Sequence, residues 1–177
     1  KKIKIFEDCC ESIGAKYNKK KIGNFGTAGS FSFYWGHHIS TIEGGMICTN
    51  NEKFYNLCKM KRSHGFAKEL KLKNYNIVKK KYNKFDSNFL FLTDGFNLRS
   101  TNFNAFIGIH QLKKLNNYIK IRNRNYKFFL SEIKKYNKYI YTIVPKNIST
   151  ISSYAFPIFF KSLKYKEIFK KKLKINK

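Results

Sequence analysis

The sequence lacks several features that would place it in a specialised class of proteins. Its four cysteines include no Cys-x-x-Cys pair, so reduced thiols are expected rather than a disulfide framework. The set Cys9, Cys10, His37 and His38 matches no zinc-binding spacing, and no metal site is expected. The sequence has no uninterrupted apolar run of about 18 residues and no apolar signal-peptide core at its start. We therefore expect a soluble cytoplasmic protein without a membrane span.

Acidic residues are also scarce. There are 10 Asp and Glu residues against 37 Lys and Arg residues, which gives a formal net charge of +27. Clustered lysines can bind nucleic acid or acidic membranes by displacing counterions, but these lysines are scattered through every segment. A coding bias towards Lys, Asn, Ile, Tyr and Phe accounts for most of the excess more simply. We do not expect a nucleic-acid partner, although a positive surface would attract phosphorylated substrates.

The size and the ends of the sequence point to part of a larger protein. The 177 residues could form one domain, and 42% hydrophobic content with 18% aromatic residues is too apolar for a disordered chain. The sequence begins in a strand-like run without an initiator Met, and it ends in a Lys-rich helical pattern with no closing element. We therefore expect a folded fragment that is truncated at both ends.

Short β-rich runs separated by turns occupy the first fifty residues. The first run stops at Glu7 and Asp8, in the way that a strand of an α/β sheet delivers an acid to its carboxyl edge. Residues 9–15 can form a brief helical turn, and residues 19–29 are rich in glycine and therefore in turns. The predicted strands are 3–6, 30–34 and 46–49.

Helical spacing of apolar residues follows. An Asn-Asn start and one apolar face predict a helix over residues 51–63. A stronger apolar stripe predicts a helix that begins at Asn102. The same spacing can continue to Ile133, with a break near Asn116 and Asn117 as one option.

The remaining segments give weaker signals. Residues 67–88 are rich in Lys and Asn and show little periodicity, which predicts an exposed loop. Residues 139–144 and 155–160 are expected to be strands of a second unit, and the Lys-rich end is expected to start a helix.

One stretch carries most of the chemical information. It is Phe31–Gly45, with the sequence FSFYWGHHISTIEGG, and it is preceded by EDCCESIG at Glu7–Gly14. It is followed by GFNLR at Gly95–Arg99 and by QLKKL at Gln111–Leu115. In this order, across about Ile3–Arg124, the segments resemble the markers of the DegT/StrS family of sugar aminotransferases, which use pyridoxal 5'-phosphate.

The resemblance implies a fold. We expect the α/β fold-type I architecture, which is aspartate aminotransferase-like and has a three-layer large domain followed by a small α+β domain. Residues 1–115 would be the C-terminal part of the large cofactor-binding domain. Residues 116–177 would be a linking helix and the start of the small domain.

The resemblance also implies cofactor-binding residues. Asp8 would face the pyridine nitrogen of the cofactor and keep it protonated, and Glu11 belongs to the same segment. Ser32 would hold the cofactor phosphate with its hydroxyl, and Asn97 would reach the phosphate of the neighbouring subunit, which implies a homodimer. Taken alone, these positions have simpler interpretations: a turn acid or helix N-cap for Asp8, an outward strand serine for Ser32, and a turn residue for Asn97.

His37 stands where members of the family carry the lysine that binds the cofactor covalently. Imidazole cannot form that link but can still move protons. A branch of the family, the 3-dehydratases of nucleotide-linked 4-keto-6-deoxy sugars, has a similar His-His pair before Ile. The resemblance therefore implies a catalytic base at His37, pyridoxal or pyridoxamine 5'-phosphate as cofactor, glutamate as amino donor, and a role in O-antigen-type surface polysaccharide biosynthesis.

Other features match the lysine-bearing aminotransferases better. Trp35-Gly36 differs from the dehydratase pattern, and Arg62–Gly65 is more similar to the aminotransferases. Three hypotheses therefore stay open: a dehydratase, an aminotransferase without its lysine, and an inactive basic binding fragment. We favour the dehydratase slightly. His38 is interpreted as a packing or hydrogen-bonding neighbour, and His64 and His110 as surface or core residues.

Overall fold

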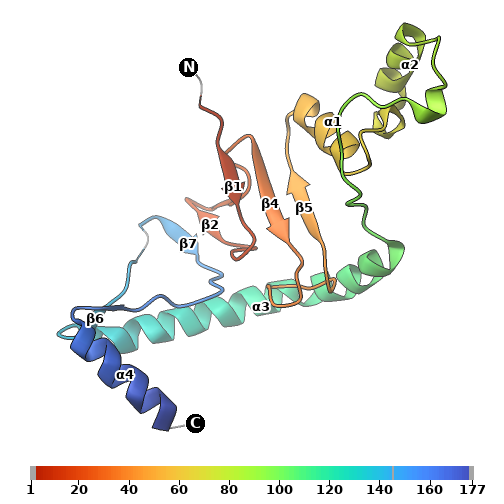
Figure 1. Ribbon diagram of the computed structural model, residues 1–177. Helices are drawn as coiled ribbons and strands as arrows, with labels where there is room; N and C mark the ends of the chain where they lie inside the picture. Colours follow the sequence, from red (N-terminus) through yellow and green to blue (C-terminus); the bar gives the residue numbers. More distant parts are fainter. Residues whose placement is uncertain (1–2, 145, 176–177) are drawn as a thin grey trace.

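A three-stranded mixed sheet forms the centre of the computed structural model, which describes residues 3–144 and 146–175 (Figure 1). Strand β1 (Phe6–Asp8) pairs in parallel with β4 (Ala28–Ser32), and β4 pairs antiparallel with β5 (Gly45–Cys48). The register sets Asp8 opposite Ser30. Because β1 and β4 are parallel neighbours, the polar residues at their carboxyl ends meet at one edge of the sheet.

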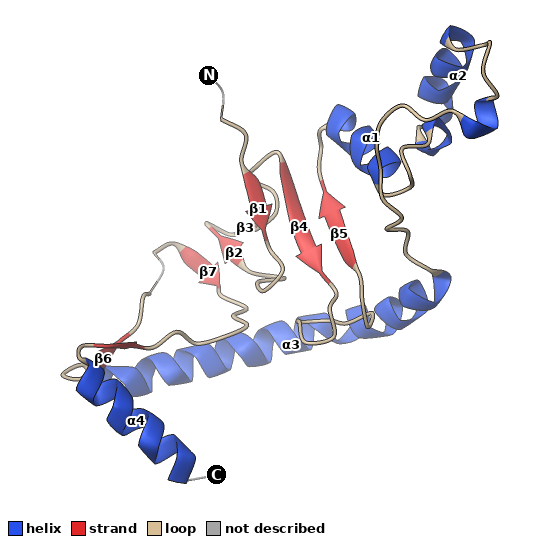
Figure 2. Cartoon of the chain, in the orientation of Figure 1, coloured by secondary structure: helices blue, strands red, loops and turns tan. Residues whose placement is uncertain are grey.

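Helix α3 (Asn102–Lys134) is the longest element and runs past the carboxyl ends of β1 and β4 (Figure 2). Its first turn is closed by a capping box, in which Thr101 Oγ1 accepts from the Asn104 amide while Asn104 Oδ1 accepts from the Thr101 amide. Of its 33 residues, Tyr126 and Ile133 are buried. Within the described residues, no helix is both long and apolar enough to cross a membrane.

Short helices follow the central sheet. Helix α1 (Glu52–Lys61) begins where Asn51 Oδ1 accepts from the Phe54 amide at 3.0 Å. A region with two 3-10 turns, η1 (Ala67–Glu69) and η2 (Ser87–Phe89), surrounds helix α2 (Leu72–Lys81). Tyr75 of α2 donates its hydroxyl to the Ser87 carbonyl at 3.1 Å, which fastens this helix to η2.

Two small sheets complete the chain. Strands β2 (Lys16–Tyr17), β3 (Lys20–Lys21) and β7 (Ile148–Thr150) form one sheet in the order β3-β2-β7. Strand β7 is antiparallel to β2, so the last third of the chain returns to the turn region that follows β1. Strands β6 (Ile140–Tyr141) and β8 (Phe159–Phe160) pair antiparallel beside the terminal helix α4 (Leu163–Ile175).

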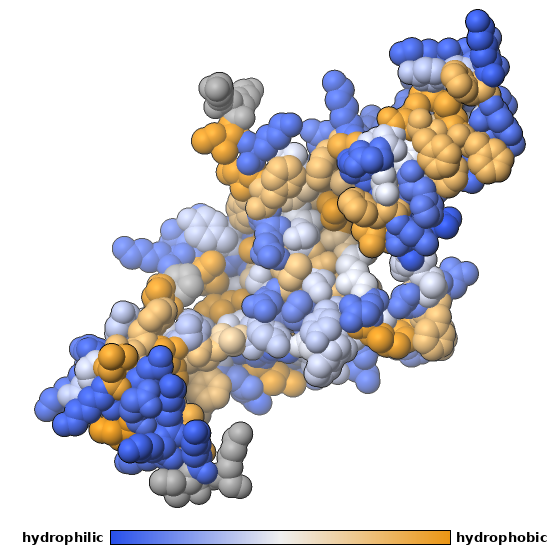
Figure 3. All heavy atoms as spheres, viewed as in Figure 1, coloured by the Kyte–Doolittle hydropathy of each residue, from blue (hydrophilic) through white to orange (hydrophobic). Residues whose placement is uncertain are grey.

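Buried side chains gather where these elements meet, while much apolar surface stays uncovered. The fully buried group includes Cys9, Ser63 and Ser152. Apolar side chains are exposed over α1 and α2 at the upper right of Figure 3 and along the first half of α3. Apolar surface of this extent is typical of a face that packs against other protein.

Several predicted elements differ from the structure. The segment 67–88 is not a loop, because it contains η1 and α2 and the start of η2. Helix α3 shows no break at Asn116 and Asn117. Residues 9–15 form turns without a helix, because their hydrogen bonds, such as Ser12 N to Cys9 O, never extend into a helical ladder.

The predicted strands and first helix are shifted or shortened. A strand was predicted at 3–6, but β1 begins at Phe6 and continues through Glu7 and Asp8, so residues 3–5 lie outside it. The sheet pairs residues 28–32 where a strand was predicted at 30–34, since the chain turns at Tyr34. The other observed bounds are β5 (Gly45–Cys48), α1 (Glu52–Lys61), β6 (Ile140–Tyr141) and β8 (Phe159–Phe160).

Candidate active site

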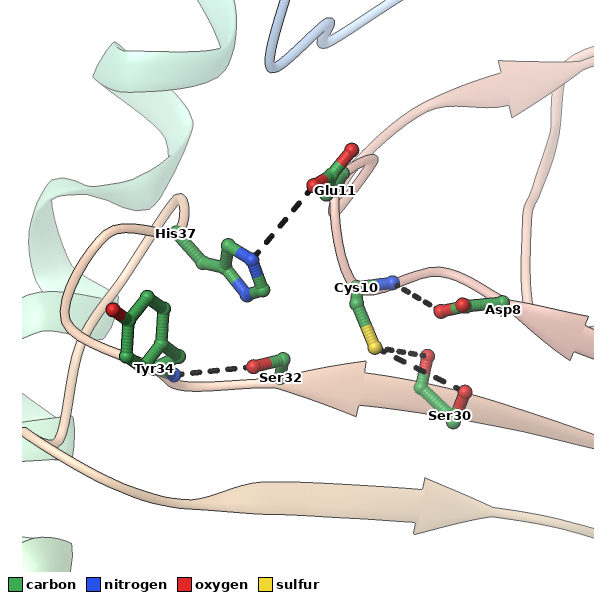
Figure 4. A network of polar contacts seen from close by, with 7 residues as sticks. All are labelled: Asp8, Cys10, Glu11, Ser30, Ser32, Tyr34 and His37. Atoms are coloured by element: carbon green, nitrogen blue, oxygen red, sulfur yellow. Dashed lines mark hydrogen bonds and ion pairs between the residues drawn. The ribbon is translucent and has the colours of Figure 1, made fainter.

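Polar side chains from three segments lie together at the carboxyl edge of the central sheet (Figure 4). Asp8 ends β1 and Ser32 ends β4, while His37 lies on the loop that joins β4 to β5. Glu11 lies on the turn after β1 and faces the His37 ring. The structure therefore brings together four of the five residues that the sequence identified.

Asp8 is exposed and ionises readily. Its Oδ1 accepts from the Cys10 amide at 3.1 Å, which is the turn contact that the simpler interpretation predicted. Hydrogen bonds from Cys10, with smaller effects from Ser30 and the charge of His37, hold the pKa of Asp8 below its ordinary value. The side chain is thus a carboxylate at neutral pH, as a partner for a protonated ring nitrogen must be.

Glu7, whose role sequence reasoning missed, organises the glycine-rich turn beside Asp8. Its carboxylate accepts from the amides of Gly23 at 2.6 Å, Phe25 at 2.6 Å and Gly26 at 2.7 Å. Burial acts to raise the pKa of Glu7, but the three amides and the nearby positive charge of Lys20 outweigh it and lower the pKa. The available signal was the pair of glycines, Gly23 and Gly26, in the turn that follows a strand ending in acidic residues.

Ser32 lies at the end of β4 with its hydroxyl directed into the cluster. Its Oγ accepts from the Tyr34 amide at 3.2 Å. That contact uses the oxygen as an acceptor, and within the described residues no acceptor is found for the hydroxyl hydrogen. The hydroxyl can therefore donate to an anion, which is the chemistry that a phosphate group requires.

His37 has one ring nitrogen near an acid and one without a partner. Its Nε2 lies 4.0 Å from Glu11 Oε1, and only 17% of the side chain is exposed. Its Nδ1 is buried and makes no hydrogen bond within the described residues. The rings of Tyr34 and Tyr154 meet the imidazole edge-on, with centroids 5.4 Å and 5.7 Å away. An imidazole held in this way can accept and return a proton.

His38 follows His37 in the chain and is 3% exposed. Its Nε2 lies 2.8 Å from the Ser152 carbonyl oxygen, which can only accept, so Nε2 carries the hydrogen. Burial lowers the pKa of His38, and the nearby positive charge of Arg122 acts in the same direction. His38 is therefore neutral at pH 7, and its interpretation as a hydrogen-bonding neighbour is confirmed.

A further residue that sequence reasoning missed anchors the histidine loop to α3. Asn104 Nδ2 donates to the Thr41 carbonyl at 2.8 Å and to the Glu43 carbonyl at 3.2 Å. Thr41 is buried, and its Oγ1 donates to the Glu43 carbonyl at 2.9 Å. The far end of the loop is therefore fixed by the same helix turn that forms the capping box.

Asn97 is not part of this cluster. It pairs with Ser63 in an isolated bridge beside the end of α1, and it is exposed. Backbone hydrogen bonds on either side, from Phe96 N to Lys61 O and from Leu98 N to Arg62 O, fix this position. Within the described residues nothing links Asn97 to Asp8, Ser32 or His37.

Comparison with known proteins identifies relatives of similar sequence. A GDP-4-keto-6-deoxy-D-mannose 3-dehydratase of Escherichia coli O55:H7 is 41% identical over 132 residues, which is 75% of this chain and 34% of that protein. A UDP-4-amino-4,6-dideoxy-N-acetyl-beta-L-altrosamine transaminase of Campylobacter jejuni is 33% identical over 156 residues, 88% of this chain and 37% of that protein. The chain thus spans about a third of the length of these relatives.

Solved structures show the same fold. An E. coli GDP-4-keto-6-deoxy-D-mannose-3-dehydratase with bound hydrated PLP superposes with a TM-score of 0.78 at 35% identity, covering 91% of this chain and 41% of that chain. The same type of enzyme with a trapped PLP-glutamate geminal diamine gives a TM-score of 0.80 at 34% identity, covering 92% and 42%. The predicted α/β fold-type I architecture is confirmed by these likenesses. Residues 1–176 match the DegT/DnrJ/EryC1/StrS aminotransferase family, and the chain belongs to that family.

Proposed function

We propose that the whole protein is a pyridoxal or pyridoxamine 5'-phosphate enzyme that removes the C3 hydroxyl from a nucleotide-linked 4-keto-6-deoxy sugar, with His37 as base. The observation that carries this proposal is the half-buried imidazole at the carboxyl edge of the sheet, in one cluster with Asp8 and Ser32. The dehydratase relatives and the similar structures support it. Glutamate is the proposed amino donor, and cytoplasmic O-antigen-type biosynthesis is the proposed setting.

The residues present fit this cofactor. An ionised carboxylate at Asp8 suits a cationic ring nitrogen, and the free hydroxyl hydrogen of Ser32 suits a phosphate. The buried Nδ1 of His37 has no protein partner among the described residues, a property that it shares with His38 Nδ1 and Asn56 Oδ1, and so this atom is available to a bound group. When bound, the cofactor supplies an electron sink conjugated to the sugar carbon.

Each side chain then has a defined task. Asp8 stabilises positive charge on the cofactor ring, and Ser32 holds its phosphate. His37 takes up a proton on a ring nitrogen and returns it, which imidazole does near neutral pH without a covalent bond. Glu11 Oε1, at 4.0 Å, stabilises the imidazolium while the proton is held, although its 63% exposure weakens this effect.

The division of the chain and its assembly belong to the same proposal. Residues 1–115 would form part of the large cofactor-binding domain, and residues 116–177 a linking helix and the start of the small domain. Asn97 would bind the cofactor phosphate of the neighbouring subunit in a homodimer. Its exposed position at a distance from the cluster is consistent with a role across an interface.

The test uses the whole protein, its cofactor, glutamate and GDP-4-keto-6-deoxymannose, with the 3-deoxy product followed by mass spectrometry. His37→Asn keeps a polar side chain but removes the base, and the rate should fall by about 10²- to 10⁴-fold. The matched control is His110→Asn, because His110 is exposed on α3. Borohydride should leave no pyridoxyl group on a lysine of the wild-type protein. A lysine adduct, or an unchanged rate in the His37 variant, would contradict the proposal.

The second candidate is an aminotransferase that works without its lysine. The transaminase relative at 33% identity favours it, as does the Arg62–Gly65 segment. In the same assay this activity would give a 4-amino sugar that retains its C3 oxygen. The two products differ in mass, so one measurement separates the candidates.

A further inference from the structure

Three segments that are distant in the sequence meet around His38. They are the histidine loop, the turn after β1, and the segment that follows β7. Ser152, which is 0% exposed, lies at the junction. Its hydroxyl donates to the Ile13 carbonyl at 2.6 Å, and its own carbonyl accepts from His38 Nε2 at 2.8 Å. One buried residue thus joins all three segments.

The position of Ser152 is itself fixed by α3 and by its backbone. Asn123 Oδ1 accepts from the Ile151 amide at 3.3 Å, and Arg122 donates to the Ser153 carbonyl at 3.2 Å. The φ angle of Ser152 is 45°, in the left-handed region that few residues other than glycine adopt. This conformation is held by contacts on both sides, so the carbonyl that His38 meets is a rigid acceptor.

His37 and His38 are consecutive but have different polar partners, because His37 Nε2 lies near Glu11 while His38 Nε2 meets the Ser152 carbonyl. The His38 side chain is anchored in the interior, so the backbone between the two residues cannot rotate freely. Tyr154, two residues after Ser152, adds a second constraint because its ring meets both imidazoles, at 5.7 Å from His37 and 6.4 Å from His38. Anchoring one imidazole therefore determines where the other one points.

We propose that His38 is a positioning residue, whose hydrogen bond to the Ser152 carbonyl sets the direction of the His37 imidazole. The expected effect of His38 on the reaction rate rests on the proposed function. The expected effect of His38 on the position of the His37 imidazole does not. Residue 38 acts through residue 37 and through the loop, without touching the reacting atoms.

The first test measures hydrogen exchange of the whole protein by mass spectrometry, in a peptide that covers the histidine loop. His38→Leu removes the donor, whereas His38→Gln retains an amide N–H that can reach Ser152. Loop amides such as those of His37 and Thr41, which bond to Tyr34 and Phe33, should exchange about tenfold faster in the Leu variant. The Gln variant and a control variant, His110→Leu, should exchange at the wild-type rate.

The second test measures kcat and KM in the same four proteins. The Leu variant should lose at least about tenfold in kcat with KM within twofold, because misdirection of a base weakens the chemical step more than binding. The Gln variant should recover most of this loss. Unchanged loop exchange in His38→Leu, or no recovery in either measurement with His38→Gln, would overturn the proposal. If the wild-type protein shows no dehydration at all, the proposed function is wrong. The hydrogen-exchange measurement then still tests whether His38 positions the loop.

Discussion

Replacing Glu7 by glutamine tests how much of the site depends on the turn that this carboxylate organises. The two carboxylate oxygens accept three hydrogen bonds from backbone amides. Oε2 accepts from Gly23, and Oε1 accepts from Phe25 and Gly26. Glutamine keeps one acceptor oxygen, but its NH₂ group faces an amide hydrogen that it cannot accept. One charge-assisted hydrogen bond is lost and one amide is left unpaired, which should lower the free energy of unfolding by about 2–3 kcal/mol.

The stability difference between wild type and Glu7→Gln should depend on pH, in a direction that the pKa of Glu7 determines. The pKa of Glu7 is lowered in the folded protein from its ordinary value of 4.5, so its contribution is fully present above pH 4.5. That contribution is lost as the pH falls towards the folded-state pKa, because the unfolded chain takes up the proton first. The difference in stability between wild type and Glu7→Gln should therefore be constant near neutral pH and should narrow below pH 4.5.

The assay is urea unfolding of the whole protein at several pH values, followed by circular dichroism. The matched control is Glu43→Gln, because Glu43 is exposed and its carboxylate has no hydrogen-bond partner among the described residues. This control should change stability by less than about 0.5 kcal/mol. Equal unfolding midpoints for Glu7→Gln and wild type at pH 7, or a difference that grows as the pH falls, would refute the reasoning.

Two further outcomes are expected. Gly29→Ala should destabilise the protein by about 1–3 kcal/mol in thermal unfolding, because the added Cβ would lie 2.6 Å from the Cα of Gly23; a stability equal to that of Gly36→Ala would contradict this. At pH 8, iodoacetamide should modify exposed Cys48 well before buried Cys9. Burial raises the pKa of Cys9 from 9.0 to about 11, which lowers its thiolate fraction about a hundredfold, and equal rates by peptide mass spectrometry would contradict this.

The elements with strong local patterns could be predicted, and those that depend on distant partners could not. Helix α3 was evident from its apolar spacing, but the suggested break at Asn116 and Asn117 was wrong. The helix propensity of Asn costs only about 0.7 kcal/mol per residue, which burial of Tyr126 and Ile133 can offset. Helix α2 was not predicted because its few apolar residues are separated by many lysines and asparagines. Strand β7 was not predicted because it has three residues and pairs with a strand that is distant in the sequence, which leaves no local pattern.

The same distinction applies to the site. Asp8, Glu11, Ser32 and His37 follow from motif order, since the sequence segment that contains each of them is itself distinctive. The contacts that organise these residues connect positions far apart in the chain. The amides bound by Glu7 lie 16 to 19 positions away, and the carbonyls bound by Asn104 lie 61 and 63 positions away. Ser152 lies 114 positions from His38. No local pattern encodes such pairs. Asn97 could be named from its motif, and its separation from the cluster of this chain agrees with the expected role toward a neighbouring subunit, which stays a prediction.

The replacement of lysine by histidine makes these distant contacts more important. A lysine side chain has a flexible four-carbon stem, which can compensate for a loop that is slightly misplaced. An imidazole is short and has only two side-chain torsions, so it can compensate less for a displaced backbone. If His37 is the base, as proposed, the loop that carries it must be rigid at the backbone. This loop is held at one end by Asn104 and in its middle by the hydrogen bond of His38 to Ser152. On this reasoning, a lysine introduced at position 37 should tolerate loss of the His38 anchor better than the native histidine does.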